Sequence, residues 1–327
     1  MPARIARHGH AGYSGRAGIG AGVLLVALGA ALWGTDGVLR VPLLREMSPV
    51  AIVLGEHLIL LLYSVPAVAL GWGALRRLGG RGWLALLVIG WGGSALATVL
   101  FTAAFAAGDP TVAILLQKTQ PLFAIALAHL VLKERLGLAY WPLFAAAMVG
   151  AYLVSFGNLS PFAALGSEAG AGALLALGAA LLWGSSTALG RFVLRDVHFH
   201  ALTGARLLLA LVPLTVIALA QGSLGEMGAG FASRPGRLLL LALVPGLLGL
   251  LLYYRGLSST RASHATLAEL AFPATAVALN WALLGVGVNA GQVVGFFLLW
   301  VAIYALGRLG RNTLRDAPTE DRAEKGR

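Results

Sequence analysis

The sequence predicts an all-α integral membrane protein with ten transmembrane helices in a 5+5 inverted repeat. Three observations support this fold class: an apolar composition, a repeated motif and the distribution of basic residues. Of the 327 residues, 58% are hydrophobic and 11% are charged, whereas a soluble protein carries roughly a quarter charged residues. So few charges leave little surface for water, and we therefore expect a chain that crosses a lipid bilayer many times.

A short motif occurs once in each half of the chain. Residues 28–34 read LGAALWG, and residues 177–184 read LGAALLWG. Such self-similarity indicates that one unit has been duplicated. If each unit crosses the bilayer an odd number of times, the second unit is inverted relative to the first. Secondary transporters are built in this way and bind substrate near the bilayer midplane.

Windows of roughly 20 apolar residues, separated by arginine, glycine, proline or acidic residues, give the helices in chain order. The first five windows are 18–39, 49–72, 82–107, 111–132 and 138–156, and the second five are 171–190, 199–220, 235–256, 262–284 and 290–308. The first window follows a basic segment, as in a signal peptide, but it ends in Trp-Gly-Thr-Asp rather than at a small-residue cleavage site. We therefore interpret it as a retained helix.

The expected organisation has two membrane repeats with three polar segments around them. We assign a cytoplasmic N-terminal segment to 1–17, the first repeat to 18–156, a periplasmic linker to 157–170, the second repeat to 171–308 and a disordered cytoplasmic tail to 309–327.

The basic residues predict which way the chain is inserted. With both termini in the cytoplasm of a bacterial cell, inner segments hold 18 of the 24 lysines and arginines. The outer segments hold Arg40, Arg45, Arg234 and Arg237, and two cations, Lys118 and Arg206, fall inside spans. Cytoplasmic loops are enriched in basic residues, so we expect a multi-pass inner-membrane protein with both termini inside.

Several local motifs are similar to those of one transporter family. They are the Trp-Gly pairs at 33–34 and 183–184, the turn at 106–110, Pro-Leu-Phe at 121–123 and Leu-Lys-Glu-Arg-Leu at 132–136. In this order they resemble the drug/metabolite transporter superfamily and its EamA-type exporters, over residues 20–308. The acidic-basic exit that members usually repeat after the ninth helix is replaced here by Gly-Val-Gly at 285–287.

The resemblance implies a non-enzymatic carrier that exports small metabolites from the cytoplasm. The aromatic content of the chain is most similar to that of exporters of aromatic and neutral amino acids. Multidrug, nucleoside and other metabolite efflux remain alternative functions, as do a channel and a membrane-embedded enzyme. The expected partners are a small-molecule substrate and the lipid bilayer, with no nucleic acid and a monomeric chain.

Ionisable residues inside spans are costly, and they are therefore functional candidates. A rise of about 1.5 Å per residue places Glu56 and Lys118 at one depth and Arg206 and Glu269 at another, on opposite sides of the midplane. We hypothesise that Glu56–Lys118 and Arg206–Glu269 are ion pairs that gate the path or hold the ligand. The alternative is that they only fix helix packing. His57 is either a proton-linked group or a polar helix contact.

An amino-acid substrate needs partners for its carboxylate and its ammonium group. The carboxylate could bind Lys118 or free backbone N–H groups where helices are interrupted near Pro121 and Pro273. The two prolines could instead mark simple packing kinks. The ammonium group could bind one of three carboxylates, at Asp36, Glu56 or Glu269.

Aromatic residues are the remaining candidates for the cavity wall. Trp33 and Trp183 could stack on the substrate, although tryptophan also forms belts at the membrane interface. The other aromatic candidates, each of which could also be ordinary packing, are Trp91, Phe101, Phe105 and Tyr253.

The sequence gives no sign of a cofactor or a metal centre. It has no cysteine, no His-Glu-x-x-His pattern and no cluster of carboxylates, and zinc enzymes depend on such ligands. We therefore expect no metal and no cofactor. Proton coupling, exchange and facilitated diffusion remain open at this stage.

Overall fold

The computed structural model describes residues 18–107, 116–157, 170–284 and 287–315. Every regular element in these ranges is helical, and none of the described residues forms a strand. The all-helical class predicted from the sequence is thus confirmed.

The helices are numbered in chain order, and two of them, η1 and η2, are π-helical segments. The first half contains α1 (Gly18–Trp33), α2 (Asp36–Leu43), α3 (Pro49–Ile59), α4 (Leu61–Leu75), α5 (Gly80–Leu87), η1 (Val88–Leu96), α6 (Ala97–Ala107), α8 (Gln120–Leu132) and α9 (Tyr140–Phe156). The second half contains α11 (Gly170–Val193), α12 (Phe199–Gln221), α13 (Leu224–Ser233), α14 (Pro235–Leu241), η2 (Ala242–Leu248), α15 (Gly249–Ser258), α16 (Ala262–Ala268), α17 (Ala271–Leu284) and α18 (Ala290–Arg315).

Within the described residues, 6 helices are long and apolar enough to cross a bilayer. They are Gly20–Leu43, Gly80–Ala104, Ala171–Val193, Phe199–Gln221, Pro235–Ser258 and Ala290–Leu309. The helices α3 and α4 pass the same test together, with a bend of 55° between them, and α8 and α9 are shorter apolar helices. The protein is therefore a multi-pass membrane protein, while a count of ten spans remains a prediction.

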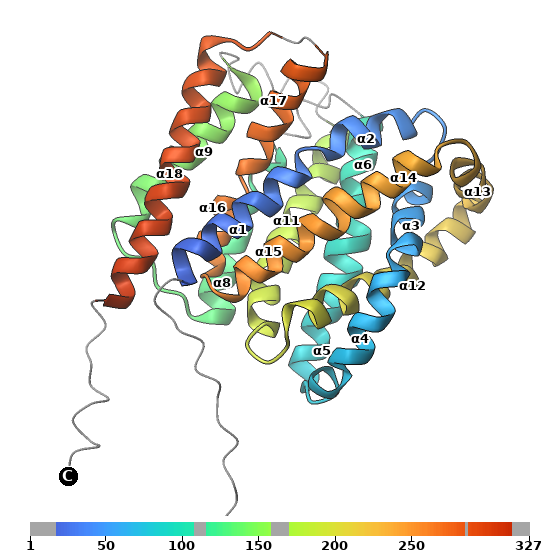
Figure 1. The fold of residues 1–327 in the computed structure, drawn as a ribbon, viewed down its shortest axis with the longest axis horizontal. Helices are drawn as coiled ribbons and strands as arrows, with labels where there is room; N and C mark the ends of the chain where they lie inside the picture. The colour runs from blue at the N-terminus through green and yellow to red at the C-terminus, as the bar shows by residue number, and fades with distance from the viewer. Residues whose placement is uncertain (1–17, 108–115, 158–169, 285–286, 316–327) are drawn as a thin grey trace, which may run out of the picture.

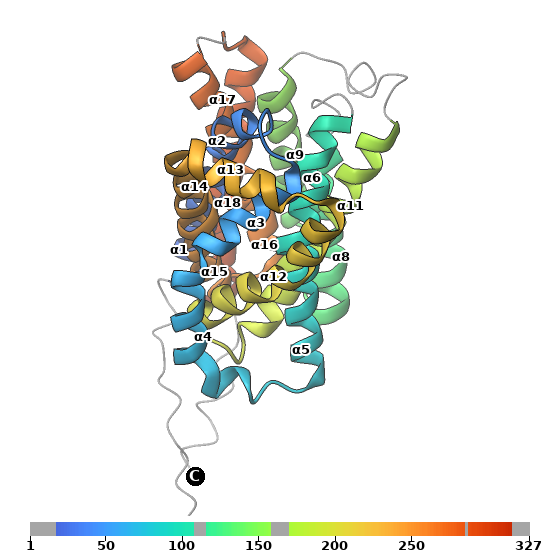
Figure 2. The same cartoon turned by 90° about the vertical axis from the view of Figure 1, so that its right-hand side faces the viewer.

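The two ends of the bundle differ in the elements that they carry (Figures 1 and 2). The turn between α4 and α5, at 76–79, lies at one end, together with the start of α1 and the end of α18. We call this the α5 end. The opposite end, which we call the α17 end, carries the turn between α17 and α18 and lies nearer to α2.

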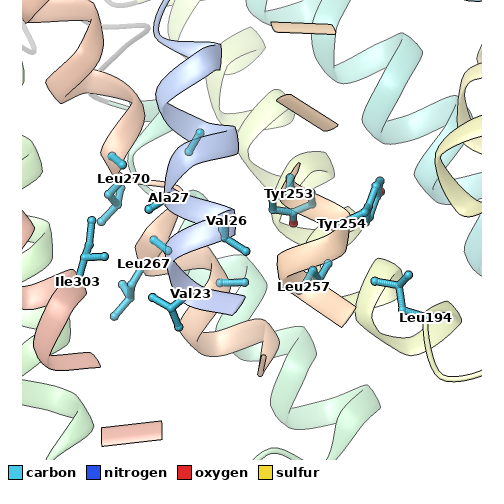
Figure 3. Close-up of a cluster of buried hydrophobic side chains, with 14 of the residues drawn as sticks. Val23, Val26, Ala27, Leu194, Tyr253, Tyr254, Leu257, Leu267, Leu270 and Ile303 are labelled. Carbon is cyan, nitrogen blue, oxygen red and sulfur yellow. The ribbon is translucent and has the colours of Figure 1, made fainter. Parts of the chain in front are cut away.

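The largest core cluster joins α1 to the second half of the chain. Figure 3 shows Val23, Val26 and Ala27 of α1 beside α15, which contributes Tyr253 and Tyr254. Helices α16 and α18 contribute to the same cluster. The first helix therefore packs against elements of the second half, which brings candidate residues of both halves together.

The two halves share two irregularities in their helices. A π-helical segment interrupts Gly80–Ala107 at η1 and Pro235–Ser258 at η2. A helix break also precedes proline in each half: α8 starts at Gln120, just before Pro121, and α17 starts two residues before Pro273. π-bulges and interrupted membrane helices are frequent at functional sites, so these places direct attention to the centre of the bundle.

Candidate functional site

The two helix breaks meet at one cavity. Its empty volume is about 200 Å³, and its lining residues are Gln117, Lys118, Gln120, Pro121, Thr266, Glu269, Leu270 and Phe272. Pockets for organic ligands usually measure about 300–1,000 Å³. The structure thus shows this site in a conformation too narrow for a substrate of that size.

Glu269 lies at the break between α16 and α17 and is 7% exposed. Its Oε1 atom lies 3.0 Å from the Thr187 hydroxyl and 3.0 Å from the Tyr253 hydroxyl. Its Oε2 atom accepts a hydrogen bond of 2.5 Å from the Gln120 side-chain amide. Among the described residues no cation lies within 4.0 Å of this carboxylate, so neutral donors alone stabilise its charge.

Lys118 lies in the break that precedes α8 and is 5% exposed. Its ammonium group donates to Gln117 Oε1 at 3.2 Å and lies 3.7 Å from the centre of the Phe272 ring. Gln117 in turn donates to Gln120 Oε1 at 2.8 Å. Hydrogen bonds therefore connect Lys118 to Glu269 through two amide side chains, without direct contact between the charges.

Arg206 forms a second buried cationic centre, on α12. Its Nε donates to the Ser94 hydroxyl and its Nη1 to the Tyr254 hydroxyl, both at 2.6 Å. The Tyr254 ring packs edge-on against Tyr253, with 5.0 Å between ring centres. Arg206 and the Glu269 network are therefore joined through two adjacent tyrosines of α15.

The expected pairing of Glu56 with Lys118 is wrong. Glu56 Oε1 instead lies 2.7 Å from Arg40 Nη1, and Arg40 also forms a bidentate ion pair with Asp36 at 2.6 and 2.7 Å. Arg40 was expected in an outer loop, but it is 6% exposed on α2. A second turn of helix after Trp-Gly carries this cation back over α3, closer to Glu56 than Lys118 lies.

The expected pairing of Arg206 with Glu269 is also wrong, because each binds neutral side chains of neighbouring helices. Equal depth along two helix axes says nothing about the rotation of either helix. Two charges at one depth can therefore point in different directions.

His57 follows Glu56 on α3 and is buried. Its Nδ1 lies 2.8 Å from the Val53 carbonyl oxygen, which requires the proton to be on Nδ1 if this contact is a hydrogen bond. Nε2 is buried and has no hydrogen-bond partner. His57 thus lies next to the Arg40–Glu56 ion pair but takes no part in it.

The two tryptophans of the repeated motif occupy corresponding positions. Trp33 packs against Tyr253, with 5.1 Å between ring centres, while Trp183 donates from Nε1 to the Gly93 carbonyl oxygen at 2.9 Å. Trp183 also packs edge-on against Phe101 at 5.2 Å. Each therefore contacts a helix next to a π-segment, Trp33 in the second half and Trp183 in the first.

The glycines that follow these tryptophans allow close packing on the broken helices. A Cβ atom at Gly34 would lie 2.7 Å from the Phe272 carbonyl oxygen, and one at Gly184 would lie 2.8 Å from that of Gln120. Because both neighbours are backbone atoms, a side chain at either position would push two helices apart. The Trp-Gly pairs thus hold α1 against α17 and α11 against α8.

The remaining candidates differ in position. Pro121 lines the cavity and Pro273 is buried next to it. Trp91 is 45% exposed on η1 and is not among the residues that line the cavity. The side chain of Phe105 lies outside the described residues.

Several residues of the network were not singled out from the sequence. They are Arg40, Ser94, Gln117, Gln120, Thr187 and Tyr254. Gln117 to Gln120 form a polar run inside an apolar window, and Ser-Ser-Thr at 185–187 follows the second Trp-Gly pair. Such polar runs would have been the signal to look for. No group of three or more potential metal ligands occurs among the described residues.

Comparison with known proteins gives consistent results. A sequence profile of the EamA-like transporter family matches residues 20–156 and again residues 170–308. The riboflavin transporter ImpX of Fusobacterium nucleatum is 30% identical over 295 residues, which cover 88% of this chain and 98% of that protein. A crystal structure with a TM-score of 0.70 and 16% identity covers 89% of this chain and 98% of its own. The latter likeness concerns the fold alone.

Proposed function

This chain belongs to the EamA-like transporter family, and we propose that it carries a small metabolite by alternating access through the cavity between α8 and the α16–α17 break. The observation that supports this proposal is that Lys118 and Glu269 line one cavity at two interrupted helices. Membrane transporters bind substrate at such interruptions near the midplane, and buried charges there are costly unless they serve function.

The leading substrate class is an aromatic or neutral amino acid, exported from the cytoplasm. Lys118 offers a cation that only neutral groups contact, and Glu269 offers a carboxylate in the same cavity. These charges complement the carboxylate and the ammonium group of a zwitterion. Phe272 at the cavity and the nearby pair of Trp33 and Tyr253 supply aromatic surface for the side chain.

Riboflavin is the second candidate. It is supported by the relative named as a riboflavin transporter, which this chain matches over nearly its full length. The amide side chains of Gln117 and Gln120 could hydrogen-bond the edge of a planar ring system, and the Phe272 ring could stack on its face. This binding mode would not need the charge of Lys118.

We further propose that the protein lies in the inner membrane of a bacterium with both termini in the cytoplasm. We also retain the ten spans, the 5+5 inverted repeat and the segment boundaries expected from the sequence. Support comes from the α5 end, where the start of α1, the end of α18 and the basic turn with Arg76 and Arg77 lie together.

Counterflow in proteoliposomes tests the carrier and its substrate. Vesicles are loaded with unlabelled tyrosine or riboflavin, and uptake of the labelled compound is followed. We expect accumulation driven by internal tyrosine, because a carrier is accelerated by substrate on the opposite side. Accumulation only with riboflavin would exclude the amino-acid proposal, and equal flux in loaded and empty vesicles would exclude a carrier.

Substitution of Lys118 tests the role of the charge. Lys118→Met should weaken binding of tyrosine by about 10- to 100-fold, the value of one charge-assisted hydrogen bond of about 1.5–3 kcal/mol. Tyramine, which lacks the carboxylate, should bind equally to both variants. Arg77→Met, an exposed cation away from the cavity, is the matched control. An equal loss for both ligands would show that Lys118 does not contact the carboxylate.

A further inference from the structure

Glu134 lies just beyond α8, in the Leu-Lys-Glu-Arg-Leu segment. Helix α8 ends at Leu132, and Lys133 takes a left-handed conformation with a φ of 58°. The backbone N–H of Glu134 then bonds back to the Ala128 carbonyl oxygen at 3.2 Å. This tight helix end reverses the chain, so that the Glu134 side chain faces the start of α16.

The Glu134 carboxylate accepts three hydrogen bonds from the first residues of α16. Its Oε1 accepts from the Ala262 N–H at 2.9 Å, and its Oε2 accepts from the Ser263 N–H at 3.1 Å and the Ser263 hydroxyl at 2.6 Å. The Tyr140 hydroxyl donates to the Ser263 carbonyl oxygen at 2.8 Å. These bonds tie the α8 exit to α16 at the α5 end.

The opposite end of α16 is tied to α8 as well. The 7 residues of α16 end at Ala268, and Glu269 follows directly and accepts a hydrogen bond from Gln120 at the start of α8. The cavity lies between these same segments, since Gln120, Thr266 and Glu269 line it. A path from the α5 end to the cavity must therefore part α8 from α16.

The contact between the two segments at the α5 end is suited to opening. The apolar cluster there consists mainly of small side chains, Ala128, Ala188 and Ala262, with Leu132. Little apolar surface is exposed when such contacts separate. The hydrogen bonds of Glu134 can be exchanged for bonds to water at an exposed end of the protein, which makes them reversible.

We propose that Glu134 is a positioning residue that latches α16 to α8, holding Glu269 in the cavity and closing the path from the α5 end. This inference rests on the proposed transport function, because it assigns a role in the cycle to that same site. When the latch releases, α16 swings from α8, and the cavity opens toward the α5 end.

Cysteine labelling tests the latch without any substrate. The chain has no cysteine, so Thr266→Cys places one thiol at a buried position that lines the cavity. A membrane-impermeant maleimide is applied from each side of proteoliposomes, with and without Glu134→Gln. We expect Glu134→Gln to raise labelling from the α5 side at least ten-fold and to lower labelling from the α17 side.

Glu226→Gln is the matched control. Glu226 accepts a hydrogen bond from the Ser48 N–H at 2.8 Å near the start of α3, so it ties a helix start in the same manner but does not touch α16. This variant should leave labelling from the α5 side unchanged. If Glu134→Gln does not fold, Ser263→Ala removes one of the three bonds and should give a smaller increase of the same sign.

Three outcomes separate the proposals. Unchanged labelling in folded Glu134→Gln and Ser263→Ala would overturn the latch, even if transport is found. An equal rise from both sides would also overturn it, because that is the result of general loosening. A rise from the α5 side alone supports the latch, and if no substrate is transported it is the proposed function that fails.

Discussion

At the scale of single residues, the buried charges near the cavity bind mainly neutral partners. Glu269 accepts from an amide and two hydroxyl groups, Lys118 binds an amide oxygen and a ring, and Arg206 binds two hydroxyl groups. Separating a buried ion pair leaves an uncompensated charge at a cost of about 3–5 kcal/mol. Exchanging neutral hydrogen-bond partners costs less, so this network can rearrange around a substrate.

The ion pair at the surface is a different case, and it predicts a pH dependence. Glu46 lies in the turn after α2 and binds Arg234 at 2.7 Å. The hydrogen bond from Arg234 holds the pKa of Glu46 below its usual value. Because the folded-state pKa is lowered, the contribution to stability is present above the unfolded pKa and is lost as pH falls through the folded value.

We therefore expect the melting temperature of the wild type to exceed that of Glu46→Gln at neutral pH. The difference should vanish as the pH is lowered through the acidic range. Thermal unfolding of both proteins in detergent between pH 3.5 and 7, on the order of the carboxyl range, checks this. The effect should be small, since exposed ion pairs contribute little. A difference that persists at the lowest pH would contradict the assignment to charge.

At the scale of elements, the site depends on interrupted helices held by close glycine contacts. The breaks before Pro121 and Pro273 bring Lys118 and Glu269 to the cavity. The Trp-Gly pairs then fix each broken helix against α1 or α11. Packing in membranes has little hydrophobic driving force, so small residues at helix contacts carry much of the stability.

Adding one methyl group at these contacts should be costly. In Gly184→Ala, the new Cβ atom would lie 2.8 Å from the Gln120 carbonyl oxygen and 2.9 Å from the Ala124 nitrogen. Such overpacking costs about 1–3 kcal/mol and should lower both the melting temperature and transport. Gly34→Ala should act in the same direction.

The matched control is Gly73→Ala on α4, where no atom lies within 4 Å of the added Cβ. It should be neutral or stabilising by about 0.5–1 kcal/mol, because alanine favours the helix. Melting curves of the three variants decide the matter. If Gly184→Ala is as stable as Gly73→Ala, the close approach of α11 to α8 does not limit this packing.

At the scale of the whole molecule, the two halves contribute corresponding features to one centre. Both contain a π-segment and a break before proline, and the family profile matches each half. The residues at the centre have nevertheless diverged: Lys118 and Gln120 in the first half correspond to Leu270 and Phe272 in the second. The centre is therefore asymmetric, as expected for a site that binds a substrate without internal symmetry.

The proposed orientation predicts opposite labelling of two engineered cysteines. Gly79→Cys lies in the turn between α4 and α5, and Gly236→Cys lies near the start of α14. Both positions are exposed, with free space around the added atom. In intact cells with an accessible outer surface, an impermeant thiol reagent should label Gly236→Cys alone. Labelling of Gly79→Cys alone would reverse the proposed topology.

Much of this protein could be predicted from its sequence. Apolar composition and helix-length windows determine that the chain is helical and lies in a membrane, because the bilayer requires each span to satisfy its own backbone hydrogen bonds. The cost of a buried charge marked Lys118 and Glu269, and proline marked the interruptions. Each of these inferences uses a local property that one segment carries by itself.

Only the tertiary structure decided which groups meet. Arg40 rather than Lys118 binds Glu56, and Gln120 rather than Arg206 binds Glu269. Likewise Glu134 reaches α16, 128 residues along the chain from it. The physical reason is that hydropathy fixes the depth of a residue in the bilayer but not the rotation of its helix. Contacts between helices depend on that rotation, which packing against neighbours determines.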